Sequence, residues 1–335
     1  MKKRQTLYFT APRQVEVREE PLPVPQAGQV LAETVVSAIS PGTELLVYRG
    51  QFPRDLADAH DSLSSSIQYP VAYGYSCVGR VVETGTQVDE SWRDRLVFSF
   101  QAHSSHFTAD VAALLPLPNA LEPETACFLP NAETAINLVH DSAPLVGERV
   151  LVFGQGIVGL LTAAVLAEFP LEKLVTVDSL PRRRAASLAL DVTACLDPRS
   201  SDFQAEARRL LLTGADVCLE LSGVPEALDE AIRLTAFSGR IVVGSWYGAK
   251  RALLDLGGSF HRSRIRLISS QVSSIAPELS GRWDKFRRFD VAWAALQRIR
   301  PEKWITQRFP LDKAPEAYRL LDEHPAETIQ VVFRY

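Results

Sequence analysis

The sequence has few cysteines and no excess of charge of either sign. Four of its 335 residues are cysteines, at positions 77, 127, 195 and 218, and no two form a C-x-x-C pair. This spacing indicates neither a zinc ribbon nor a redox dithiol, and it favours a reduced, cytoplasmic chain. The 36 basic and 40 acidic residues leave a net charge of −4. We therefore expect no nucleic-acid partner and no anionic membrane surface.

No apolar segment follows the basic N-terminal residues, so we expect no signal peptide. The one long apolar run, residues 150–167, is interrupted by three glycines. Such a run is typical of a buried strand, a turn and a buried helix, and we expect no membrane span. The length favours two globular domains.

Residues 1 to about 125 contain short strand patterns separated by proline and glycine. Spans 5–9 and 15–18 predict a hairpin, and 29–37, 78–82 and 96–100 are further strand candidates. This pattern predicts a β-rich first domain. The polar stretch 54–68 predicts a loop, which either lies beside a ligand or is a plain connection.

From about 145 to 275, strand and helix patterns alternate. Strands are expected at 149–153, 174–177, 193–196, 217–221, 240–244 and 267–270, with helices at 181–190, 203–212 and 225–236. This α/β alternation predicts a doubly wound parallel sheet with its ligand at the carboxyl ends of the strands. The later helix 314–324 and strand 329–333 have no place in that sheet, so we expect them to return to the first domain.

A G-x-G-x-x-G motif lies between the first of these strands and the helix that follows it. The first glycine allows a tight turn, the second lets a pyrophosphate approach, and the third lets helix and strand pack closely. A pyrophosphate would then bind at the helix N-terminus. The motif predicts a dinucleotide site formed by Gly154, Gln155, Gly156, Ile157, Val158 and Gly159.

Asp178 ends the next expected strand, at the spacing of an acid that binds the adenosine ribose. Its charge would repel a 2′-phosphate by about 4 kcal/mol at 4 Å, which favours NAD over NADP. Three arginines at 182–184 keep NADP open as the alternative. Arg183 is the candidate cofactor ligand among them, and a solvated helix face is the structural alternative.

With these features in place, the whole chain resembles the medium-chain dehydrogenase/reductase superfamily. Segments 35–44, 69–85 and 305–318 are similar to its first catalytic segment, its Gly-His-Glu segment and its C-terminal block. The resemblance implies a GroES-like β-rich catalytic domain (1–127), a Rossmann domain (128–275) and a return to the catalytic domain (276–335). Two short motifs, at residues 39–44 and 74–75, look nearest to those of bacteriochlorophyllide a dehydrogenase and similar polyol-dehydrogenase relatives.

The chain departs from zinc-dependent members at the positions of the metal ligands. Ser40 stands in place of their cysteine, and Tyr75 and Ser76 stand in place of their histidine and glutamate. Region 128–137 offers Glu133 alone. A catalytic zinc needs three protein ligands, so we expect none here.

Without a metal, other groups must stabilise the charge that develops on a carbonyl oxygen and supply a proton. The resemblance places Tyr75 and Ser40 at the nicotinamide, although Tyr75 would equally fill the emptied metal site. Thr43 matches a proton-relay position or caps the helix that follows, and His103 is a candidate general acid/base or a surface residue. Glu44 is expected to pair with Arg49 along that helix.

The resemblance also places the ends of the later Rossmann strands along the nicotinamide and its ribose, at Ser222, Gly244, Ser245 and Ser269. The leading hypothesis is a zinc-independent, NAD-preferring oxidoreductase that transfers hydride between nicotinamide and an alcohol or carbonyl. Alternatives are an enoyl or quinone reductase, and a non-catalytic nucleotide-binding sensor or structural protein. The partners expected are a small-molecule substrate and a second copy of the chain, joined at the edge of the Rossmann sheet.

Overall fold

The computed structural model describes residues 2–52 and 67–335, so most of the stretch 54–68 lies outside the described residues. The chain divides into two compact units. Among the described residues, the first unit contains those up to 130 and those from 296 onward, and the second contains 131–295. The second unit thus extends beyond the residue 275 expected from the sequence, because it includes most of helix α8 (Lys285–Ile299).

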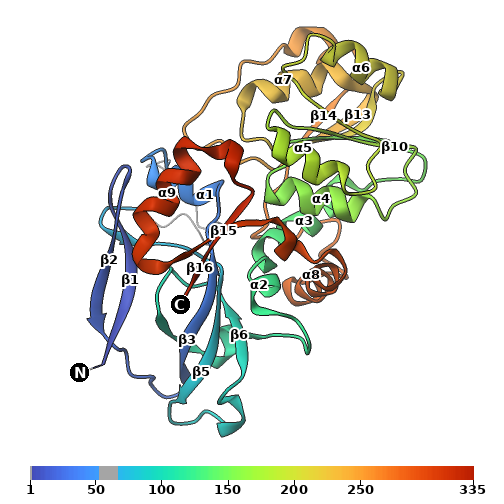
Figure 1. The fold of residues 1–335 in the computed structure, drawn as a ribbon. Helices are drawn as coiled ribbons and strands as arrows, with labels where there is room; N and C mark the ends of the chain where they lie inside the picture. Colours follow the sequence, from blue (N-terminus) through green and yellow to red (C-terminus); the bar gives the residue numbers. More distant parts are fainter. Residues whose placement is uncertain (1, 53–66) are drawn as a thin grey trace. The chain divides into compact units, whose positions relative to one another are not determined.

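The first unit contains two β-sheets (Figure 1). A three-stranded sheet has the order β2 (Gln14–Pro21), β1 (Lys3–Ala11), β4 (Val71–Ala72). A larger sheet has the order β15 (Ile305–Pro310), β16 (Gln330–Arg334), β3 (Gln29–Ala38), β5 (Cys77–Thr84), β6 (Leu96–Ser99), β8 (Leu115–Pro116). A further strand of this sheet, β7 (His106–Asp110), pairs with β3 outside that order. The expected hairpin is confirmed, since Leu7 pairs with Val17 in antiparallel register.

The C-terminal strand completes the larger sheet of this unit. Phe333 of β16 lies opposite Ser37 of β3, which confirms that the chain returns to the first domain. Helices α1 (Thr43–Tyr48) and α9 (Ala314–Glu323) pack into the same core, where Val47 and Tyr318 lie beside Phe9 and Phe333. A short helix α2 (Pro123–Ala126) follows β8.

The second unit is built on a six-stranded parallel sheet. Its order is β11 (Ala194–Leu196), β10 (Lys173–Val177), β9 (Arg149–Phe153), β12 (Ala215–Glu220), β13 (Thr235–Val243), β14 (Arg266–Ser269). All neighbouring strands are parallel. The order runs outward in both directions from β9, which confirms the doubly wound fold and puts the switch point between β9 and β12.

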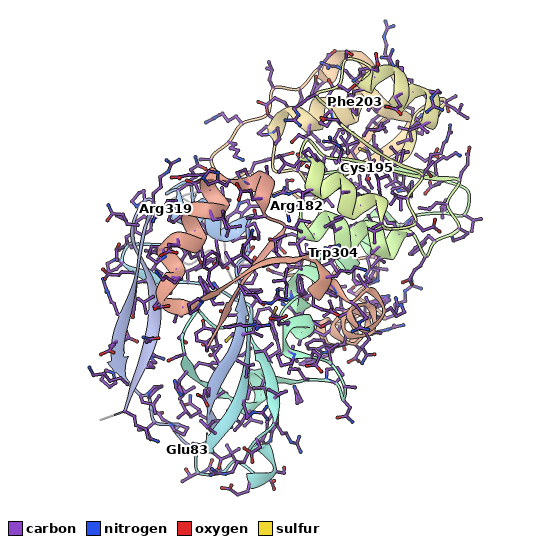
Figure 2. All side chains as sticks on the ribbon, viewed as in Figure 1. Glu83, Arg182, Cys195, Phe203, Trp304 and Arg319 are labelled. Atoms are coloured by element: carbon purple, nitrogen blue, oxygen red, sulfur yellow. The ribbon has the colours of Figure 1, made fainter. Side chains whose placement is uncertain are left out.

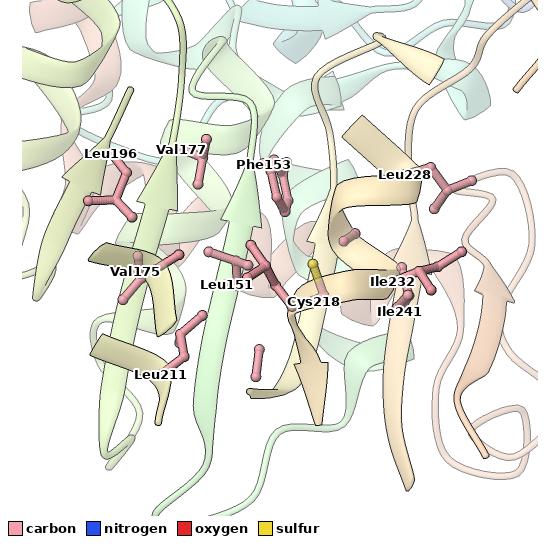
Figure 3. Packing of buried hydrophobic residues seen from close by; sticks show 14 of the residues in the cluster. Leu151, Phe153, Val175, Val177, Leu196, Leu211, Cys218, Leu228, Ile232 and Ile241 are labelled. Atoms are coloured by element: carbon pink, nitrogen blue, oxygen red, sulfur yellow. The ribbon is translucent and has the colours of Figure 1, made fainter. Parts of the chain in front are cut away.

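Apolar side chains fill both faces of this sheet. Leu151 and Phe153 point to one face, where they belong to a core that includes Phe203 and Leu211 (Figure 3). Two helices contribute to this core, α6 (Phe203–Leu211) and α7 (Pro225–Leu234). Val150 and Val152 alternate with Leu151 and are equally buried, because successive side chains of a strand point to opposite faces.

The remaining helices are α3 (Leu129–Ser142), α4 (Ile157–Leu166) and α5 (Pro181–Leu188). The sequence predicted that helix 225–236 would run two residues beyond the observed end of α7. The chain instead enters β13 at Thr235, whose hydroxyl donates to the carbonyl of Ala231 at 2.7 Å. No helix in the described part of the chain is both long and apolar enough to cross a membrane.

Candidate active site

The G-x-G-x-x-G motif forms the turn between β9 and α4. At Gly154, which has φ +88°, a Cβ atom would lie 2.6 Å from the main chain of Leu221. At Gly159 a Cβ atom would lie 1.9 Å from the carbonyl oxygen of Gly154. Gly156 caps α4 and has open space around it, apart from a guanidinium nitrogen of Arg183 at 3.7 Å from its Cβ position. The turn therefore leaves the N-terminus of α4 accessible to an anion.

Asp178 follows β10 and faces the same turn. One carboxylate oxygen accepts the main-chain N–H of Gln155 at 2.7 Å, and the other accepts that of Leu180 at 2.8 Å. Each oxygen has a further lone pair, so a ribose diol can still donate to this carboxylate. Gln155 is fully buried, and its side-chain oxygen has no hydrogen-bond partner.

The three arginines at the start of α5 have different surroundings. Arg184 donates to the carbonyl of Asp178 at 3.0 Å and pairs with Asp197 at 3.0 Å, while Arg182 is exposed (Figure 2). Arg183 is half-buried, and its Nε has no hydrogen-bond partner. Burial lowers the pKa of its guanidinium, and the negative charge of Asp178 opposes that effect. The same guanidinium lies within 4 Å of the Cβ position of Gly156. In the first turn of α4, Ile157 is buried and Val158 is half-buried.

Glu220, the last residue of β12, organises the ends of the later strands. It is fully buried, and one oxygen accepts both the N–H of Ser222, at 2.8 Å, and the Ser222 hydroxyl. Tyr247 donates to the other oxygen at 2.5 Å, and burial together with Glu220 raises the pKa of Tyr247. Sequence reasoning missed Glu220, whose only signal was an acidic residue at the end of an apolar strand.

Most of the residues predicted to bind the cofactor at these strand ends form hydrogen bonds with Glu220 or with its neighbours. The N–H of Gly244 donates to the main-chain carbonyl of Glu220 at 3.0 Å, and the hydroxyl of Ser245 accepts the N–H of Gly223 at 2.9 Å. Ser269 ends the edge strand β14 and is exposed. The hydrogen bonds of Gly244 and Ser245 therefore hold the carboxyl ends of these strands together. Of the four predicted residues, Ser269 has the exposed side chain.

Three of the predicted catalytic residues come together in the first unit. The hydroxyl of Tyr75 donates to the hydroxyl of Ser40, and Thr43 is also within hydrogen-bonding range of Tyr75. Burial raises the pKa of Tyr75 to about 12, although its hydrogen bonds with Ser40 and Thr43 oppose the rise. We call Tyr75, Ser40 and Thr43 the hydroxyl cluster. Thr43 is the first residue of α1 and Gly42 is its N-cap, so the expectation that Thr43 caps the helix is wrong.

His103 is fully buried and is not a surface residue. Its Nε2 lies 2.9 Å from a carboxylate oxygen of Glu44, and its Nδ1 lies 2.7 Å from the hydroxyl of Ser37. Its ring packs against Gly74, where a Cβ atom would lie 2.8 Å from the ring. Both ring nitrogens are engaged, so His103 supports Gly74, the residue that precedes Tyr75, and is linked to Ser40 through Glu44.

Glu44 is a second residue that sequence reasoning misjudged. The expected pair with Arg49 is wrong, because Arg49 pairs with Asp322 at 2.5 Å. Glu44 is fully buried, and it accepts the N–H of Ser40 at 2.8 Å and the hydroxyl of Tyr318 as well as bonding His103. This carboxylate thus connects α1, α9 and the hydroxyl cluster.

The residues at the positions of metal ligands do not fit a catalytic zinc. Ser40 and Tyr75 are bonded to each other, and the hydroxyl of Ser76 donates to the carbonyl of Cys127. Glu133 is occupied by Arg288 at 2.7 Å. Within residues 2–52 and 67–335, no three His, Cys, Asp or Glu side chains gather as a metal site. A donor set of hydroxyls lacks the thiolate and imidazole ligands that zinc prefers.

Residues 158–289 match the family model described as zinc-binding dehydrogenase. The chain is 24% identical over 265 residues to D-guloside 3-dehydrogenase of Escherichia coli, covering 77% of this chain and 76% of that one. A solved Escherichia coli structure, described as a short chain alcohol dehydrogenase complexed with NADH, matches with a TM-score of 0.80, 17% identity and 99% coverage of both chains.

A second solved structure, a putative zinc-binding dehydrogenase of Sinorhizobium meliloti bound to NADP, matches with a TM-score of 0.78, 18% identity and 100% coverage of both chains. Both structures thus match the fold over both units of the chain. Together, the family model and the named relatives support an oxidoreductase of the medium-chain dehydrogenase/reductase superfamily.

Proposed function

We propose that this protein is a zinc-independent, NAD-preferring oxidoreductase that transfers hydride between the nicotinamide and an alcohol or carbonyl substrate. The observation that carries the proposal is the hydroxyl cluster, in which Tyr75 and Ser40 are bonded to each other. By resemblance, these two residues match metal-ligand positions of zinc-dependent relatives. The glycine turn and Asp178 support the dinucleotide half of the proposal. We expect the substrate to be a small molecule.

When bound, the nicotinamide supplies or accepts the hydride. In the direction of reduction, a C–H bond forms at the carbonyl carbon and the electron pair of the C=O bond moves to oxygen. The hydroxyl of Tyr75 then transfers its proton to that oxygen, and solvent returns a proton to Tyr75. Hydrogen bonds with Ser40 and Thr43 stabilise the tyrosinate in between.

Tyr75 is suited to donating a proton and less suited to removing one. Because its pKa is raised to about 12, the hydroxyl is protonated at neutral pH. An alkoxide is a still stronger base, so the proton transfer to it is favourable. In the oxidative direction, Tyr75 must first lose its proton, and we expect oxidation to be slow at neutral pH and faster at alkaline pH.

Asp178 supports a preference for NAD, since its carboxylate is held by two main-chain N–H groups and cannot move away from a 2′-phosphate. Arg183 lies at Gly156, where the pyrophosphate of either cofactor would bind. We therefore propose that Arg183 contributes to binding without reversing the preference.

The test is hydride transfer measured with NADH and NADPH on a panel of aldehydes, ketones, enones and quinones, with elemental analysis of the same preparation. We expect carbonyl reduction that persists with a chelator and with negligible zinc. Tyr75→Phe should lower kcat about 100-fold or more. Tyr73→Phe removes a hydroxyl two residues away and should leave kcat unchanged.

Three outcomes would overturn the proposal. Turnover that requires zinc would restore a metal mechanism. Reduction of enones or quinones alone would identify a C=C or quinone reductase. Tight NADH binding with no turnover across the panel would favour a nucleotide-binding sensor or structural protein.

We also propose a homodimer formed through β14, the edge strand of the six-stranded sheet, where Leu267 is 42% exposed. An unpaired strand edge with an apolar side chain can pair with a second copy. Light scattering should give twice the chain mass, and Leu267→Lys should give a monomer.

A further inference from the structure

The largest fully buried side chain of the described residues is an arginine, Arg288 of helix α8. Its Nε and one terminal nitrogen donate to the same oxygen of Glu133, at 3.1 and 2.7 Å. The other terminal nitrogen donates to the side-chain oxygen of Asn137 at 2.5 Å. Glu133 and Asn137 both lie on α3, so this arginine joins two helices of the second unit.

The remaining two N–H groups of Arg288 reach the segment that follows β14. One donates to the carbonyl of Ser274 at 3.0 Å, and the other donates to the carbonyl of Val272. A guanidinium carries five N–H groups, and all five of them are bonded here. Its rigid planar geometry therefore determines where Val272 and Ser274 lie relative to α3 and α8.

A second set of bonds fixes the beginning of the same segment. The hydroxyl of Ser270 donates to Asp141 at 2.6 Å and accepts from Asn137 at 2.9 Å. Asn137 also donates to Asp141 at 2.9 Å. The side chain of Ser270 is thus tied to α3 directly, and the carbonyls of Val272 and Ser274 are tied to it through Arg288. We call residues 270–274 the clamped segment.

The position of the clamped segment at the sheet suggests why it is held so firmly. It continues from the carboxyl end of β14, and dinucleotides bind across the carboxyl ends of such a sheet. Asp178, after β10, is expected to bind the adenosine, and the glycine turn, after β9, is expected to bind the pyrophosphate. Both strands lie on one side of the switch point. The nicotinamide half must then extend over β12, β13 and β14, where the clamped segment lies.

A buried ion pair is a poor source of stability, because the cost of removing both charges from water offsets much of their attraction. What such a pair does provide is a defined position for the groups bonded to it. Arg288 and Glu133 meet this description, since both are buried and the arginine has no unused donor. We propose that Arg288 is a positioning residue that orients the clamped segment to bind the nicotinamide half of the cofactor.

This inference rests on the proposed dinucleotide site, and its test separates the two halves of the cofactor. Binding of AMP reports the adenosine half alone, whereas binding of NADH requires both halves. We expect Arg288→Met to raise the Kd for NADH about tenfold, as the loss of oriented polar contacts would. The Kd for AMP should be unchanged. Both constants are measured by calorimetry at a temperature where the variant is folded.

The chain offers a matched control in Arg240 of β13, another buried arginine of the second unit. Arg240 pairs with Glu148 at 2.7 Å and donates to the carbonyl of Ala143 at 2.8 Å. Glu148 immediately precedes β9, so this pair lies at the amino end of the sheet, away from the ligand edge. Arg240→Met should lower the melting temperature and leave the Kd for NADH unchanged.

Arg288→Lys keeps the charge beside Glu133 but loses the planar fork, and it serves if Arg288→Met does not fold. It should also weaken NADH binding and spare AMP. The inference is overturned if AMP and NADH binding weaken equally in the Arg288 variants, if neither weakens, or if Arg240→Met weakens NADH binding as much. Failure of the unaltered protein to bind either AMP or NADH would instead overturn the proposed function.

Discussion

In the glycine turn after β9, atoms are held in place by close packing of main chain on main chain. In the hydroxyl cluster beside α1, they are held by hydrogen bonds among buried polar side chains. The turn brings Gly159 against the carbonyl of Gly154, with no room for one more carbon atom. The cluster depends on Glu44, which accepts bonds from Ser40 and Tyr318 and contacts His103.

This difference determines what kind of change each region tolerates. A packed main-chain turn is disrupted by added volume, whatever the charge of the new group. A buried carboxylate network is disrupted by a change of charge or of donor count, even when the volume stays the same.

The largest effect is expected for Gly154→Ala. The new Cβ would lie 2.6 Å from the main chain of Leu221 at a φ of +88°, so we expect a loss of about 3 kcal/mol or more in the free energy of unfolding. Gly147→Ala is the control, because Gly147 has a φ of +81° but open space around it, and the same change should cost about 1 kcal/mol. Urea denaturation measures both. Equal losses would mean that the positive φ angle causes the destabilisation and that the closeness of the Leu221 main chain to Gly154 adds nothing.

The next effect tests the other region by changing charge without changing volume. Glu44→Gln replaces an acceptor with an N–H₂ group that faces donors, so we expect a loss of about 2 kcal/mol. Glu124, which pairs with Arg308 at 2.8 Å and Arg334 at 2.6 Å near the surface, is the control, and Glu124→Gln should cost about 1 kcal/mol or less. If the two variants unfold at the same urea concentration, the burial of Glu44 does not increase what its hydrogen bonds contribute to the free energy of unfolding.

A smaller effect is expected on cofactor preference. Asp178→Asn removes the charge that opposes a 2′-phosphate, and it should raise the affinity for NADPH relative to NADH about tenfold. The ratio of the two affinities cancels any general weakening of the site. Asp197→Asn alters a nearby carboxylate that pairs with Arg184 and Arg199, and it should leave the ratio unchanged. A ratio that does not move in Asp178→Asn would remove the basis for an NAD preference.

The last effect concerns Tyr75 and appears only at alkaline pH. Its pKa rises from an ordinary value of 10.0 to about 12 in the folded protein, so folding favours the protonated hydroxyl. The stabilisation is complete below pH 10.0 and is lost as pH rises toward 12, because the unfolded chain releases this proton first. Urea midpoints between pH 9 and 11.5 should therefore fall less steeply for Tyr75→Phe than for the unaltered protein. Parallel profiles would contradict the burial of this hydroxyl.

Much of the second unit could be predicted from the sequence. The six strands, the glycine turn and Asp178 are recognised because their pattern is local, with each element read from a window of a few residues. Contacts formed by partners far apart in the chain could not be predicted. Arg288 and Glu133 are separated by 155 positions, and neither helix pattern signals that its charged residue points inward.

The first unit shows the same limit at shorter range. Local spacing on a helix predicted that Glu44 would pair with Arg49, yet tertiary packing turned Glu44 into the core and paired Arg49 with Asp322, 273 positions away. His103 was expected in a reacting role or at the surface, and packing against Gly74 placed it in the interior. Helix α1 has only six residues, so its neighbours decide which face is buried.

By itself, the sequence determined the class of both domains, the dinucleotide turn and the replacement of metal-binding side chains by hydroxyls. Glycine spacing, strand alternation and residue identity are properties that the chain has before it folds. The tertiary structure alone decided which polar side chains share a buried site, because hydrogen bonds and ion pairs form between atoms brought together from distant segments. The hydrogen bonds of Glu44 with His103, of Glu220 with Tyr247 and of Arg288 with Glu133 all arise in this way.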